Sequence, residues 1–275
     1  MMNVFLHSEK IKQKNNMKLT DNELAQLKEA KKLLEHPAFL MELSNIVGKP
    51  IEKLYSFLPA KFQEGAGDLA KKVLLKSLNM LVSKMDTGNN IKPNNLMHKI
   101  FVTGTGTVGG FFGLASLAIE LPVTTTIMLR SIADIAKSKG FNINDPETKL
   151  ACLEVFALGG NSKRDDFSDS AYYITRGALA QAVTEANRYL LQKGFAKESA
   201  PALVSFISKV ASRFGIIISE GAAAKSVPVI GAASGGAINL VFMNHFQRMA
   251  EGHFTVMQLE NKYGKEEVME IYKSI

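Results

Sequence analysis

The sequence predicts an all-α fold, and three observations predict it. Apolar residues recur at helical spacing, as in the stripe formed by Leu69, Val73, Leu74, Leu78 and Leu81. Prolines open and glycines close several of the periodic segments, which is the usual asymmetry of helix ends. No series of segments alternates apolar and polar residues over the length of a strand. We therefore expect a single multi-helix domain.

The N-terminal third should contain four helices. The first should begin at a capping box, Thr20-Asp21-Asn22-Glu23, because the Thr hydroxyl and the Glu carboxylate can bond reciprocally to exposed backbone N–H groups, and it should end near His36. Two short helices and a longer one that carries the leucine stripe should follow, delimited by Pro37, Gly48, Pro50 and Pro59. We expect residues 1–19 to be a disordered or extended arm, 20–90 an N-terminal helical layer and 91–275 the core.

The remaining helices should be bounded by similar signals. Pro122 should start a helix that Gly140 stops. The other expected boundaries are Asp145-Pro146-Glu147 to Gly159-Gly160, Ser168 or Asp169 to Gly194, and helical patterns over 200–214, 228–250 and 254–273, the last interrupted by Gly264.

A glycine fingerprint in the centre of the chain invites a different fold. Gly104, Gly106 and Gly109 match G-x-G-x-x-G, but that pattern binds a dinucleotide only when a second strand follows and presents an acid to the ribose. Helical sequence continues instead, so we expect no nucleotide and no other cofactor. Small residues lie four positions apart in this central segment, and the same spacing occurs at Gly231 and Gly235. Such pairs are typical of helices whose backbones approach closely.

Two glycine-rich runs contain no charged residue, 100–119 and 226–247, and each is long enough to span a bilayer. Threonines and glycines dilute the first run, and Asn239, Asn244 and His245 dilute the second, so both are less apolar than ordinary transmembrane segments. We therefore expect two buried Gly-rich core helices. The alternative is an amphitropic protein that inserts these helices into a membrane as a hairpin.

Charge and cysteine content restrict the function classes. The net charge is +7, and residues 1–100 hold 16 Lys against 10 acidic residues. Such a field suits an anionic membrane surface, whereas no dense basic run with interleaved aromatics favours nucleic acid. Cys152 is the single cysteine, which excludes an intramolecular disulfide and a zinc site of several thiolates. A cytoplasmic location, peripheral to the inner face of the cell membrane, fits this composition.

The candidate site residues are polar side chains inside otherwise apolar segments, because such groups are costly to bury unless they are paired. They are Glu120, Thr125, Arg130, Glu154, Arg176, His253 and Glu260. An internal salt-bridge network is their expected structural role. One functional alternative is a site for an anion such as a lipid phosphate, with Arg130 and Arg176 as donors and hydroxyls from 124–126. We expect no metal, since a lone His is a poor ligand set.

Three segments carry a family resemblance. They are GGFFGLASLAIELPVTTTIMLRSIADIAKSKGFNINDPETKLACLEVFALGG at 109–160, the residues 171–179 with Tyr172-Tyr173-x-x-Arg176, and VPVIGAASGGAINLVFMNHFQRMAEGHFTVMQLENKYGKEEV at 227–268. Together they resemble the EcsC protein family, which is named from a protein encoded beside a bacterial ABC transporter. The resemblance implies a bacterial protein whose own activity is not established beyond a peptidase label.

The resulting hypothesis is a non-catalytic helical protein that binds at the cytoplasmic face of a membrane, or to a partner protein such as a transporter, in transport or secretion. The chain has no HExxH, no GxSxG and no Ser followed three residues later by Lys, so the peptidase label gains no support. Cys152 lies in an apolar helix and is expected to be an inert thiol. A hydrolase would require a pocket that joins Glu154 and Arg176 with His253 or Glu260.

Overall fold

The computed structural model describes residues 19–35, 38–54, 58–83, 117–160, 170–194, 200–226 and 231–275. These residues form helices and no strand, which confirms the predicted all-α single domain. The elements are α2 (Asp21–Glu35), α3 (Phe39–Val47), α4 (Ile51–Leu54), α5 (Ala60–Ser83), α7 (Leu117–Ser138), α8 (Pro146–Glu154), the 3₁₀ turn η3 (Val155–Ala157), α9 (Ala171–Lys193), α10 (Pro201–Lys225), α11 (Gly231–Tyr263) and α12 (Lys265–Ser274).

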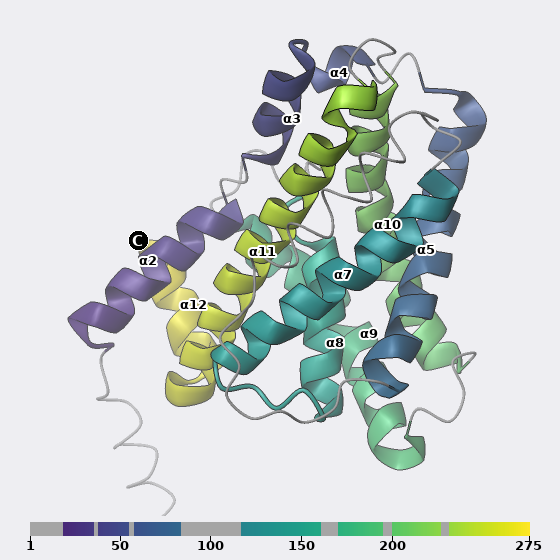
Figure 1. The fold of residues 1–275 in the computed structure, drawn as a ribbon. Coiled ribbons are helices and arrows are strands. Elements are labelled where there is room, and N and C mark those ends of the chain that lie inside the picture. The colour runs from purple at the N-terminus through teal and green to yellow at the C-terminus, as the bar shows by residue number, and fades with distance from the viewer. Residues whose placement is uncertain are drawn as a thin grey trace, which may run out of the picture.

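Two long helices organise the packing (Figure 1). Helix α10 packs on α5 and α9, and α11 packs on α2, α7 and α3. The terminal elements α2 and α12 lie together at one end of α11, while α3 and α4 lie at the other end. One continuous apolar core runs through all of these helices, so the N-terminal helices are part of the same body as the C-terminal ones.

Glycines allow two of these helix pairs to approach closely. A Cβ added to Gly215 of α10 would lie 3.1 Å from the backbone of Gly67 in α5, so the two backbones are nearly in contact. A Cβ on Gly252 of α11 would lie 2.7 Å from Leu34 Cγ of α2. The sequence predicted close approach at Gly231 and Gly235 and in the run 100–119. Of these, 100–116 lies outside the described residues.

Most of the predicted helix ends are confirmed. The Glu23 N–H donates to Thr20 Oγ1 at 3.3 Å and the Thr20 N–H donates to Glu23 Oε2 at 3.0 Å, as expected for the capping box. Helix α8 begins at Pro146. The glycines that end or separate helices have positive φ angles, a backbone conformation that residues with a Cβ rarely adopt: Gly140 (87°), Gly159 (69°), Gly194 (61°) and Gly264 (99°). Ser168 and Asp169 lie outside the described residues.

Three predicted boundaries are wrong. Helix α7 begins at Leu117, so Pro122 lies inside it rather than at its start. Helix α10 continues past 214 to Lys225, and α11 is unbroken between 250 and 254. Gly215 and Gly252 do not end their helices, and each lies where the neighbouring helix leaves little room for a side chain. Packing therefore overrides the local preference of glycine.

Among the described helices, α10 is the one that is long and apolar enough to cross a membrane by length and composition, and 56% of its most apolar window is buried. Core helices of soluble proteins satisfy the same criterion. The predicted run 226–247 overlaps the first half of α11, and no described part of it reaches that level of hydropathy.

Candidate functional site

Four of the seven candidate residues lie in one cluster, which we call the tyrosine–arginine cluster. It consists of Glu154 from α8, Tyr172, Tyr173 and Arg176 from α9, and His253 and Glu260 from α11. Its central contact is an ion pair in which Arg176 NH1 donates to Glu260 Oε1 at 2.7 Å. The two side chains are 13% and 8% exposed. The pair is thus largely shielded from water. Charge-assisted hydrogen bonds are stronger in such an environment than in water.

The two tyrosines hold this ion pair in place. The Tyr173 hydroxyl donates to Glu260 Oε1 at 3.0 Å. The Arg176 guanidinium lies 5.3 Å from the ring centroid of Tyr172 and 5.8 Å from that of Tyr173, within cation–π range of both. The rings meet edge to face at 5.1 Å. The two tyrosines therefore pack on each other and also contact the charged groups, which goes beyond the packing role expected from the sequence.

His253 is buried and neutral. Its Nδ1 lies 3.0 Å from the Tyr172 hydroxyl, and its Nε2 has no hydrogen-bond partner in the described structure. Burial first, and then the positive charge of Arg176, hold the pKa of His253 well below its usual range. The imidazole can therefore exchange a hydrogen bond with Tyr172, but it is not a cation near neutral pH.

Glu154 is the group in the cluster whose protonation changes near neutral pH. Its side chain is buried on α8, and burial raises the pKa of Glu154 to about 7. The positive charges of Arg176 and Lys265 oppose the increase, whereas Glu260 and Glu147 reinforce it. A buried carboxyl with this pKa can both give and take a proton at physiological pH, which is the property of a general acid or base.

The cluster extends to α2 and α12 through residues that sequence reasoning missed. The Tyr272 hydroxyl donates to Glu35 Oε1 at 2.9 Å, and the backbone N–H of Tyr172 donates to the same oxygen at 3.3 Å. Burial raises the pKa of Glu35. Neither Glu35 nor Tyr272 stands out in the sequence, because the first ends an ordinary amphipathic helix and the second lies in a polar terminal one.

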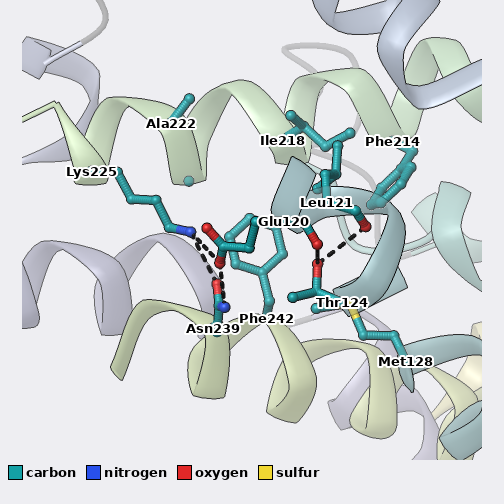
Figure 2. Close-up of a pocket in the computed structure, with 11 residues that line it drawn as sticks. Glu120, Leu121, Thr124, Met128, Phe214, Ile218, Ala222, Lys225, Asn239 and Phe242 are labelled. Carbon is teal, nitrogen blue, oxygen red and sulfur yellow. Dashed lines mark hydrogen bonds and ion pairs between the residues drawn. The ribbon is translucent and has the colours of Figure 1, made fainter. Parts of the chain in front are cut away.

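Glu120 belongs to a second cluster, which we call the Glu120 cluster (Figure 2). It lies near the beginning of α11, whereas the tyrosine–arginine cluster lies near the end of that helix. Lys225 Nζ donates to Glu120 Oε1 at 2.8 Å and to Asn239 Oδ1 at 3.1 Å, and Asn239 Nδ2 also donates to Glu120 Oε1. The Lys225 and Glu120 side chains are 3% and 5% exposed. Burial lowers the pKa of Lys225, while Glu120 acts in the opposite direction. One feature of the sequence could have pointed to Lys225, because it is the charged residue directly before the uncharged run 226–247.

The other two candidates join neither cluster. Thr125 is buried on α7, and its hydroxyl has no hydrogen-bond partner in the described structure. Arg130 is exposed on the same helix, whereas Arg176 is occupied by Glu260. The anion site predicted from the sequence uses both arginines as donors, and it stays a prediction.

Other chemistry is sparse in the described residues. Burial raises the pKa of the Cys152 thiol well above its usual range, so the thiolate nucleophile does not form readily. No group of three or more His, Cys, Asp and Glu residues that could hold a metal ion is found among the described side chains.

These features define a class of protein: an all-helical domain with charged clusters buried between its long helices. The model of the EcsC protein family matches residues 21–257, which is most of the chain, so this protein belongs to the EcsC protein family. No curated protein and no solved structure matches the chain significantly.

The pKa of Glu154 predicts how stability depends on pH. Because the folded-state pKa is raised from 4.5 to about 7, the favourable contribution of Glu154 is fully present below pH 4.5 and is lost as pH rises through 7. The free energy of unfolding of wild type relative to Glu154→Gln should therefore fall by about 3 kcal/mol between pH 4.5 and 8.

Urea unfolding of both proteins at several pH values measures this difference. Glu267→Gln, at an exposed carboxyl on α12, is the matched control and should show no such trend. Parallel pH profiles of wild type and Glu154→Gln would contradict the assignment.

Proposed function

We propose that this EcsC protein acts by binding, and that its target is an anionic membrane surface at the cytoplasmic face. The observation that carries the proposal is the location of the excess positive charge. The chain has a net charge of +7, yet the described residues 19–83 hold nine Lys against eight acidic residues. Two flanking segments, 1–18 and 84–100, hold seven Lys against two acidic residues and lie outside the described residues.

The charges inside the helical body support the same proposal, because many of them are used on one another. Arg176 pairs with Glu260 and Lys225 with Glu120, and both pairs are too buried to contact a membrane surface. Among the described surface residues, three further pairs link distant parts of the chain: Arg248 with Glu42 at 2.6 Å, Lys262 with Glu23 at 2.7 Å and Lys139 with Glu251 at 3.1 Å. The positive field available to a large anionic partner therefore comes mainly from the two flanking segments.

Vesicle flotation tests this proposal. The protein should float with anionic vesicles at low salt, remain behind with neutral vesicles, and dissociate at high salt because surface charges are then screened. Replacing Lys10, Lys12, Lys14 and Lys18 with Gln should weaken binding at least about tenfold, since each well-placed basic residue contributes about 1 kcal/mol.

The control replaces four exposed lysines of the helical body, Lys28, Lys32, Lys72 and Lys76, with Gln. This variant changes the net charge equally and should keep most of its binding. Equal loss in both variants would mean that net charge alone acts. Failure of the wild-type protein to float would reject the membrane and favour a protein partner such as a transporter. Flotation that survives high salt and carbonate would instead favour an inserting amphitropic protein.

A second candidate function, a hydrolase, is favoured by one specific observation. Glu154, Arg176, His253 and Glu260 lie in one cluster, and the pKa of Glu154 is about 7. These are the residues that a hydrolytic site would have required, and perturbed pKa values gather at active sites. In such a site Glu154 would transfer the proton and the neutral His253 would orient Tyr172.

A panel of peptide and ester substrates tests the hydrolase hypothesis. Turnover by the wild-type protein should be lost in Glu154→Gln by about a hundredfold or more, which is the usual contribution of a general acid–base group, while the unfolding transition persists. Turnover that survives in Glu154→Gln, or no turnover on the whole panel, would reject this role for Glu154.

A further inference from the structure

A cavity of about 20 Å³ lies beside the Glu120 cluster (Figure 2). One end is polar and is formed by Glu120, Lys225 and Asn239, whereas Thr124 lies farther along, with its hydroxyl bonded to the Glu120 and Leu121 carbonyls. The rest is apolar, and its walls are Leu121, Met128, Phe214, Ile218, Ala222 and Phe242, together with Gly221. The space exceeds the roughly 10–15 Å³ that a single water requires. The cavity therefore has the size and the lining of a site for a very small molecule with one polar group.

Among the described residues, the hydrogen bonds at the polar end leave one acceptor and one donor unused. Glu120 Oε1 accepts from both Lys225 and Asn239, while Glu120 Oε2 is buried and has no partner in the described structure. Lys225 has three N–H groups and gives two of them, to Glu120 and to Asn239. An unpaired carboxylate oxygen in the interior is costly, so a ligand that donates to it would stabilise the fold.

The charges at this end select the kind of ligand. One carboxylate and one ammonium line the same small space, and because their opposite charges nearly cancel, neither an anion nor a cation gains a net attraction there. A neutral hydroxyl both donates and accepts, which matches Glu120 Oε2 and the remaining N–H of Lys225. An apolar carbon attached to that hydroxyl would contact Leu121, Met128 and Phe242.

We propose that this cavity binds a small neutral alcohol, with its hydroxyl between Glu120 and Lys225 and its carbon body against the apolar wall. Gly221 fixes the size of the site. A Cβ at this position would lie 2.2 Å from the Phe242 ring, so glycine is what allows that ring to form a wall of the cavity. A body longer than one or two carbons has to displace Phe242. This site is independent of the membrane-binding proposal, because its residues are inside the helical body.

Nuclear magnetic resonance of protein labelled with ¹³C at the methionine methyl groups tests the proposal, because Met128 lines the cavity. Titration with ethanol should shift the Met128 resonance, assigned through Met128→Leu, along a saturating curve. Acetonitrile, which is of similar size and accepts but does not donate a hydrogen bond, should give no saturating shift. Met269 on α12, which does not line the cavity, serves as an internal reference.

The double variant Glu120→Gln with Lys225→Met tests the role of the polar end. It should fold, because exchanging a buried ion pair for neutral residues of similar size is often tolerated, and far-ultraviolet circular dichroism checks this. Its ethanol affinity should fall about tenfold or more, as hydrogen bonds to two charged groups are lost.

The matched control is Glu42→Gln with Arg248→Met, which removes a surface ion pair and should leave ethanol binding unchanged. A linear shift without saturation would show that ethanol does not enter the cavity, and equal saturating shifts with acetonitrile would show that the hydroxyl is not what the site recognises. Either result would overturn the proposal. Unchanged affinity in the folded Glu120–Lys225 double variant would overturn it as well.

Discussion

The ion pair between Arg176 and Glu260 positions α9 relative to α11, because α9 packs mainly on α10 and makes few other contacts with α11. It joins α9 to α11 at 2.7 Å with little exposure to water. The same glutamate accepts the Tyr173 hydroxyl, and the same guanidinium packs on Tyr172. Removal of either partner would leave a buried charge without its counterion, which typically costs 3–5 kcal/mol. The protonation of Glu154 and His253 is set mainly by their burial, and the charge of Arg176 lowers the pKa of both groups.

The Glu120 cluster applies the same constraint near the other end of α11. Asn239 and Glu260 lie on one helix, 21 residues apart, which corresponds to about 30 Å along its axis. Through these two residues α11 is fixed to α7 and α10 at one end and to α9 at the other. Apolar contacts alone would permit small shifts of one helix along another, whereas two buried polar clusters specify the register. Gly215 adds a steric limit between α10 and α5, and Gly252 adds one between α11 and α2.

The sequence predicted local features well because their causes are local. The capping box at Thr20 and the glycines Gly140, Gly194 and Gly264 act within a few residues of themselves. The sequence also marked Glu154, Arg176, His253 and Glu260 as candidate residues, because charged or polar side chains in apolar segments need partners when they are buried. It could not supply the partners. Lys225 is 105 residues from Glu120, and Tyr272 is 237 residues from Glu35. Gly252 stays inside a helix for a reason that only the packing against Leu34 provides.

The most direct test of this account is a double-mutant cycle on the central ion pair, with Arg176→Met, Glu260→Gln and the double variant compared by urea unfolding at pH 8. The account predicts that each single substitution destabilises by about 3–5 kcal/mol and that the double variant loses much less than the sum, giving a coupling energy above about 2 kcal/mol. Additive losses with a coupling near zero would contradict the claim that this pair holds α9 and α11 together.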